Sequence, residues 1–105
     1  MWLCMTDSFL SIVDKGDPSR QTLLVRARYP GDIERVFPEA EVVEGAGTDY
    51  RFRARIDRGV VALRMAEAIR DINYPNFKSA VPDRARHDTY AACWRHLLSW
   101  QDKSN

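Results

Sequence analysis

The sequence has few cysteines, no long apolar run and almost no net charge, and each shortage excludes a class of protein. Two cysteines among 105 residues are too few for the disulfide framework of a small secreted domain. No apolar stretch approaches the ~20 residues of a membrane-spanning helix, and Met1–Met5 is too short for a signal sequence. Sixteen basic residues balance 15 acidic ones, for a net charge of +1, so a global attraction to nucleic acid or membrane is not expected. The sequence predicts a soluble, cytoplasmic protein that binds no membrane.

Cysteines and histidines are also too few and too far apart to indicate a metal site. Cys4 and Cys93 form no CxxC unit and show no ligand spacing with either histidine. We expect two buried or half-buried thiols in a reducing cytosol, with a disulfide between the two as the alternative. Phosphate-binding loops, dinucleotide fingerprints, HExxH and EF-hand patterns are missing, and no serine stands in a GxSxG context. No cofactor and no catalytic residue is predicted, and the balance favours a protein that is not an enzyme.

The chain does contain enough apolar material for a packed core. Hydrophobic residues make up 45% of the sequence, including three Trp, four Tyr and four Phe, which argues against extensive disorder. A length of 105 residues fits one compact domain. We therefore expect a single α+β domain over residues 1–101 and a frayed tail over residues 102–105.

The order of apolar patterns and turn residues predicts four strands and three helices. Apolar runs of strand length occur at 8–14, 23–28, 41–44 and 50–56. Helical spacing of apolar residues occurs at 32–37, 58–72 and 83–101. Asp32, Asp57 and Asp83 stand where these helices begin and are candidate N-caps. The resulting order, ββαββαα, predicts a four-stranded antiparallel sheet with the helices on one face, and a ferredoxin-like layout is one candidate.

The segment over residues 50–56 carries the most informative pattern. Its apolar side chains alternate with arginines, as in a half-buried strand. The outward row consists of Arg51, Arg53 and Arg55. Tyr50 and Phe52 fall on the opposite, buried side. An all-arginine row, in place of a mixed polar face, indicates a binding surface.

The strand at 23–28 adds Arg26 and Arg28 on its polar side. Five guanidinium groups on two strands form a platform that binds carboxylates or phosphates bidentately. The alternative is a solvated face whose arginines pair within the chain. The acids considered for that pairing are Asp14, Glu41, Glu44 and Asp49.

A turn at residues 73–78 is the second candidate surface, because it holds two aromatics, two amides and a lysine around a proline. Its candidate binding residues are Tyr74, Asn76 and Lys78. In the alternative, Tyr74 and Phe77 dock on the core and the amides cap free backbone groups.

His87 and Tyr90 are secondary candidates on the helix predicted over 83–101. An acid–base pair of His87 with Asp49 or Asp83 would suit a small enzyme. A structural, hydrogen-bonded His87 is the favoured alternative, because no nucleophile stands near it in the sequence.

Several segments together resemble a family of small bacterial proteins for which no activity is established. They are Met1-Trp2-Leu3, Phe9-Leu10-Ser11-Ile12-Val13, Val25-Arg26-Ala27-Arg28, Asp49-Tyr50-Arg51-Phe52-Arg53, Tyr74-Pro75-Asn76-Phe77-Lys78 and the segment from His87 to Trp94. The resemblance covers nearly the whole chain in order. It implies no catalytic residues, and it implies that the arginine strands, the turn and the last helix belong to one shared design.

The sequence therefore predicts a non-enzymatic protein that binds an acidic protein partner through its arginine-rich sheet face and the turn at 74–78. One alternative is an accessory protein of a phage or mobile element that inhibits host defence, as anti-CRISPR proteins do; this is an analogy of size and charge. A second is a nucleic-acid-binding module, which is less favoured because Tyr50 and Phe52 are predicted to be buried and so unavailable to stack on bases. A small enzyme using His87 is a third. A homodimer paired through an exposed edge strand is compatible with each.

Overall fold

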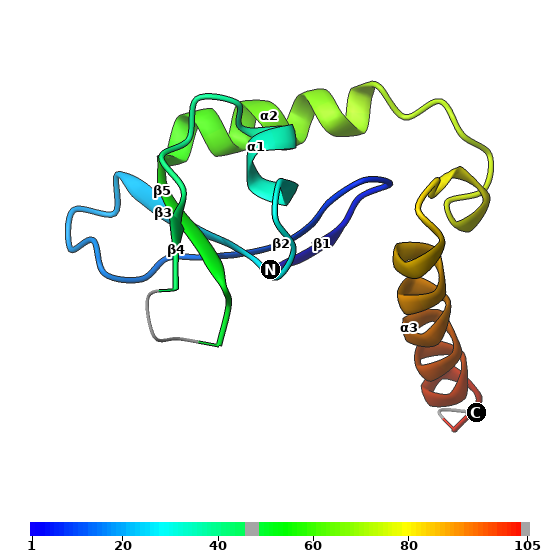
Figure 1. Cartoon of the computed structure of the whole chain (residues 1–105). Coiled ribbons are helices and arrows are strands. Elements are labelled where there is room, and N and C mark those ends of the chain that lie inside the picture. Colours follow the sequence, from blue (N-terminus) through cyan, green and yellow to red (C-terminus); the bar gives the residue numbers. More distant parts are fainter. Residues whose placement is uncertain (46–48, 104–105) are drawn as a thin grey trace. The chain divides into compact units, whose positions relative to one another are not determined.

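The computed structural model describes residues 1–45 and 49–103. The chain divides into two compact units, Met1–Asn73 and Tyr74–Asn105. The first unit contains the sheet and the second contains the long C-terminal helix (Figure 1). The single domain expected over residues 1–101 stays a prediction.

The first unit is built on an antiparallel sheet that has five strands within the described part of the chain. They are β1 (Trp2–Cys4), β2 (Phe9–Val13), β3 (Thr22–Ala27), β4 (Val43–Glu44) and β5 (Phe52–Asp57). Their order across the sheet is β1-β2-β3-β5-β4, and every neighbouring pair is antiparallel. The α+β class and the antiparallel sheet are confirmed.

The predicted strand count and element order are wrong. The missing strand, β1, has only three residues, too few to show the alternation by which a strand is recognised in a sequence. A ferredoxin-like layout needs the order βαββαβ, whereas three strands precede the first helix here. The four strands that were predicted are present, with shifted ends.

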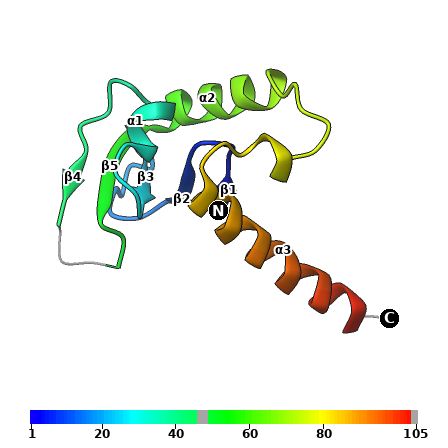
Figure 2. The same cartoon turned by 45° about the vertical axis from the view of Figure 1, so that its right-hand side comes forward.

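Two helices, α1 (Asp32–Val36) and α2 (Arg58–Arg70), cover one face of the sheet. Both views place them on the same side of the strands (Figures 1 and 2). The core between the sheet and these helices contains Leu10, Ile12, Val25, Ala27, Ile33, Phe37, Phe52, Ala54, Ile56 and Val61. Since side chains alternate along a strand, the residues between these core positions lie on the other face.

Two of the three predicted N-caps are confirmed. The Asp57 carboxylate accepts hydrogen bonds from the backbone N–H groups of Gly59 (2.9 Å) and Val60 (3.2 Å) at the start of α2. Asp83 accepts one from the N–H of Arg86 (2.8 Å). Asp32 is not a cap, because it is the first residue of α1 and its carboxylate accepts a hydrogen bond from the backbone N–H of Phe9 on β2.

Only the first half of α2 packs as its apolar pattern predicts. Val61 is buried and Met65 packs against the core, whereas Ile69 and Ile72 are exposed. Helical periodicity therefore identified the helix correctly but overestimated how much of it the sheet covers.

The second unit consists of a short 3-10 turn, η1 (Lys78–Ala80), and α3 (Arg84–Lys103). Phe77 stacks on Tyr90 of α3 at 5.4 Å between ring centroids. The helix continues past its expected end at Gln101, so the tail expected over 102–105 is helical at its start. Residues 104–105 lie outside the described residues.

The two cysteines differ from expectation. Cys4 on β1 and Cys93 on α3 are exposed, not buried or half-buried as expected. No helix in residues 1–45 and 49–103 combines the length and apolar character needed to cross a bilayer.

Candidate functional site: the open face of the sheet

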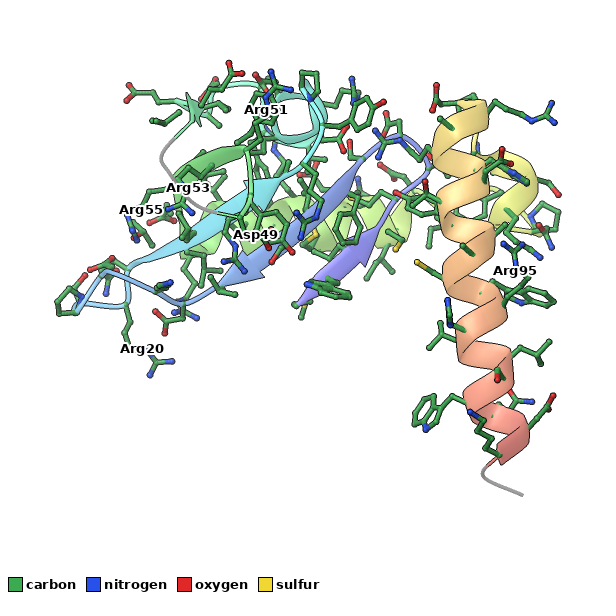
Figure 3. All side chains as sticks on the ribbon, turned by 60° about the horizontal axis from the view of Figure 1, so that its bottom comes forward. Arg20, Asp49, Arg51, Arg53, Arg55 and Arg95 are labelled. Carbon is green, nitrogen blue, oxygen red and sulfur yellow. The ribbon has the colours of Figure 1, made fainter. Side chains whose placement is uncertain are left out.

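The candidate site is the side of the sheet away from α1 and α2, called here the open face. Cross-strand pairing places Ser11 of β2 beside Arg26 of β3, and Arg26 beside Arg53 of β5. Arg55 follows two positions along β5, and so points the same way. Figure 3 looks onto the strands with α2 behind them, and shows Arg53 and Arg55 along β5. The two arginine-bearing strands, β3 and β5, are therefore neighbours in the sheet.

Arg26 is held in place from two directions. Its Nη2 donates to the hydroxyl of Ser11 (2.8 Å), and its guanidinium lies 4.5 Å from the ring centroid of Tyr50. Such a cation–π contact contributes about 0.5–2 kcal/mol. Its Nε is buried and donates to no atom of the residues described here. Arg26 therefore holds its guanidinium in a fixed position on the open face.

Tyr50 is not on the side of the sheet that its sequence position predicted. Its ring lies under Arg28 (4.2 Å) as well as under Arg26, although it is itself only 5% exposed. Arg28 in turn forms a bidentate ion pair with Asp49, at 3.1 and 3.0 Å. These hydrogen bonds hold the pKa of the Asp49 carboxyl below its usual range and raise the pKa of Arg28.

Arg51 also departs from the predicted row. It pairs with Glu44 (Nε to Oε1, 3.1 Å) and lies 5.3 Å from the Phe52 ring. Glu44 is the cross-strand partner of Phe52, which belongs to the core. Alternation requires extended backbone, and β5 begins only at Phe52. The sequence pattern therefore fails for Tyr50 and Arg51 and holds from Phe52 onward.

Arg55 is positioned by the loop that joins β2 to β3. Its Nη1 donates to the carbonyl of Lys15 (3.0 Å) and lies 3.4 Å from the hydroxyl of Thr22. Gly16 makes this approach feasible, because a Cβ there would lie 2.8 Å from Nη2 of Arg55, and its φ of +85° also disfavours other residues.

Asp17 orders the same loop through four hydrogen bonds. Its carboxylate accepts from the N–H and hydroxyl of Ser19 (3.0 and 2.7 Å) and of Thr22 (2.9 and 2.7 Å). These bonds, those from the two hydroxyls first, hold the pKa of Asp17 well below its usual range. A depressed pKa in the folded state stabilises the protein above the unfolded pKa of about 3.9 and ceases to do so as pH falls through the folded value.

We expect Asp17→Asn to flatten the acid side of the stability profile. The amide retains only one acceptor oxygen and does not titrate, so the variant is less stable than the wild type near neutral pH and loses less stability as the pH falls below about 4. Melting temperatures recorded from neutral to acidic pH test this. Parallel profiles for the two proteins would contradict the role given to Asp17.

Pairing within the chain accounts for some of the sheet arginines and not for others. Arg28 and Arg51 have carboxylate partners, as the alternative interpretation predicts. Asp14, another acid considered for that role, pairs instead with Arg20 (2.7 Å) and Arg58 (3.1 Å). These surface pairs are each worth about 0–1 kcal/mol.

Arg26 and Arg55 are different, since neither forms a direct ion pair with a carboxylate among the residues that the structure describes, although Asp49 attracts Arg26 at longer range. Arg26 also stands directly opposite Arg53 in the sheet. Like charges placed opposite one another destabilise a strand pair. The centre of the open face therefore favours an anion.

The turn at residues 74–78 uses its polar groups inside the second unit. The side-chain oxygen of Asn76 accepts from the N–H (3.0 Å) and hydroxyl (3.1 Å) of Ser79, which caps η1. Lys78 Nζ lies 3.9 Å from the ring centroid of Trp94, and Tyr74 contacts Phe77 at 5.9 Å. The bond from Ser79 N–H to Asn76 agrees with the capping role in the alternative interpretation, whereas Phe77 packs on Tyr90 of α3.

The secondary candidates also have local contacts. Nδ1 of His87 lies 3.1 Å from the Asp88 carboxylate, and the backbone N–H of His87 donates to the Asp83 carbonyl. Tyr90 is buried beneath Phe77. Within the described ranges, no group of three or more His, Cys, Asp and Glu side chains is placed to hold a metal ion.

Sequence analysis missed the aromatic part of the open face. Trp2 of β1 is the cross-strand partner of Ser11, and its ring meets Phe9 edge to face at 6.0 Å. Trp2 is 73% exposed. The position of Trp2 follows from the pairing of β1 with β2, and no local sequence pattern predicts that pairing.

Comparison of the chain with protein-family models, with curated proteins and with solved structures finds no match. The resemblance to a family of small bacterial proteins stays a prediction.

Proposed function

We propose that the protein is a non-enzymatic binding protein whose open face engages an acidic segment of a partner protein. The anchoring groups are Arg26, Arg53 and Arg55. The proposal rests on the sheet alone, because Asn76 and Lys78 of the turn already have partners in their own unit. We place the interaction in the cytoplasm, since the exposed thiols of Cys4 and Cys93 suit a reducing compartment.

The observation that carries the proposal is the fixed guanidinium of Arg26, which forms no direct ion pair with a carboxylate of the described residues. Ser11 and Tyr50 hold it in one position, so little conformational entropy is lost when it binds a carboxylate. Its hydrogen bond goes to the Ser11 hydroxyl, whereas the nearby Asp49 carboxylate, which also attracts Arg26, forms its bidentate ion pair with Arg28. Arginine and aromatic residues are also the side chains that dominate binding energy at protein interfaces.

A protein carboxylate suits this face better than a nucleic-acid backbone. A single strand carries a phosphate at every nucleotide and needs a continuous basic track. Here the basic centre is bordered by the exposed carboxylate of Asp49, and the net charge of the chain is +1. Such a surface favours one or two discrete anions.

The test replaces the three anchoring arginines by serine and measures binding of a fluorescently labelled peptide composed of Glu and Leu. We expect the triple variant Arg26→Ser, Arg53→Ser, Arg55→Ser to bind at least about tenfold more weakly than the wild type. Its thermal stability should be nearly unchanged, because the substitutions also remove the unfavourable Arg26–Arg53 juxtaposition.

A second triple variant, Arg84→Ser, Arg86→Ser, Arg95→Ser, is the matched control, since it removes the same charge from α3. It should change peptide affinity by less than about twofold. Equal losses in the two variants would mean unspecific charge attraction and would overturn the proposal. Tighter, steeply salt-dependent binding of oligo(dT) would replace it with a nucleic-acid function.

A further inference from the structure

The open face has an aromatic end on β1 and a basic centre on β3 and β5. One cross-strand row runs Trp2, Ser11, Arg26, Arg53, Val43 from β1 to β4. The neighbouring row runs Val13, Leu24, Arg55 from β2 to β5. In both rows the guanidinium groups stand on β3 and β5, and the aromatic side chain stands on β1; Val43 on the opposite edge strand is apolar but much smaller than Trp2.

The apolar end is a formed aromatic surface. Trp2 is 73% exposed, and the edge-to-face contact with Phe9 at 6.0 Å restricts its ring. Phe9 is itself fixed, because its backbone N–H donates to the buried carboxylate of Asp32 (3.0 Å). A large exposed indole on the same face as basic side chains is the composition of a protein-binding surface.

The spacing between the two ends follows from the sheet. Trp2 and Arg26 are separated by two strand spacings in one row, which corresponds to about 10 Å. A carboxylate bound at Arg26 therefore leaves an apolar side chain of the same ligand within reach of Trp2.

We infer that the partner segment is amphipathic as well as acidic, placing a carboxylate on Arg26 and Arg53 and an aliphatic or aromatic side chain on Trp2 and Phe9. This inference rests on the proposed function and names the chemistry of its partner. Charge complementarity selects the acidic group, and the aromatic end selects its apolar neighbour. A purely charged ligand leaves the indole exposed to water and binds less tightly.

Two labelled peptides of equal charge test the inference, one composed of Glu and Leu and the other of Glu and Ser. The wild type should bind the Glu/Leu peptide at least about tenfold more tightly. Trp2→Ala should abolish this preference. Trp100→Ala, which removes a similarly exposed indole (69%) from α3, should retain it.

A measurement on the unmodified protein guards against misfolding of the variant. The indole N–H resonance of Trp2 should shift during titration with the Glu/Leu peptide, while those of Trp94 and Trp100 stay in place. Equal wild-type affinity for both peptides, or an unmoved Trp2 resonance, would overturn the inference. The proposed function would survive that result if the arginine triple variant still lost binding, and both would fail if it did not.

Discussion

Replacing Phe37 by alanine is expected to lower the free energy of unfolding of the first unit by about 3–5 kcal/mol. Phe37 closes α1, is 3% exposed, and packs in the core cluster between that helix and the sheet. The substitution removes the transfer energy of the ring and leaves a cavity that the surrounding strands fill only in part. Urea denaturation followed by far-UV circular dichroism measures the change.

Leu63→Ala is the matched control for this prediction, because Leu63 lies on α2 and is 60% exposed. Its effect should stay within about 0.5 kcal/mol. A change of less than about 1 kcal/mol for Phe37→Ala would mean that α1 does not seal the core. Since α1 and α2 leave only one face of the sheet available, such a result would also remove the basis for the open face.

Asp32→Ala should produce the second largest loss of stability, about 2–3 kcal/mol. The Asp32 side chain is 1% exposed, accepts the backbone N–H of Phe9 (3.0 Å), and forms an ion pair with Arg35. Alanine leaves the N–H without its acceptor where water cannot reach it readily, and a buried unsatisfied donor is costly. Asp32→Asn keeps one acceptor oxygen and should fall between alanine and the wild type.

The control is Asp71→Ala, which breaks the exposed pair with Arg70 (3.1 Å). Exposed pairs contribute little, so its effect should stay within about 0.5 kcal/mol in the same denaturation experiment. An Asp32→Ala variant no less stable than Asp71→Ala would show that Asp32 does not tie α1 to β2. The aromatic end of the open face would then lack the support ascribed to Phe9.

Local chemistry explains which parts of the fold were predictable. Asp57 and Asp83 cap their helices as expected, because a cap bonds to backbone two or three residues away. Asp32 has the same apparent signal but bonds to Phe9 across the unit. No local pattern distinguishes the two cases, since the choice depends on which backbone donor tertiary packing brings near.

In the candidate site, too, some features follow from local sequence pattern and others only from tertiary packing. Alternation correctly placed Phe52 in the core and Arg53 and Arg55 on the other face. It failed at Tyr50 and Arg51, where the chain bends before β5 begins. The pairing of Arg28 with Asp49 was among the alternatives that the sequence left open, and only the folded chain selected it.

By itself the sequence determined the α+β class, most of the strands and the existence of an arginine-bearing face, because periodicity and capping depend on neighbouring residues. Tertiary structure alone decided that β1 joins the sheet, that Trp2 stands in one row with Arg26, and that Arg26 donates its hydrogen bond to Ser11. Strand register and ion pairing join residues far apart in the chain, so no local pattern encodes them. The arginines of the open face could be recognised in the sequence, whereas the position of Trp2 in the same row as Arg26 depends on the fold.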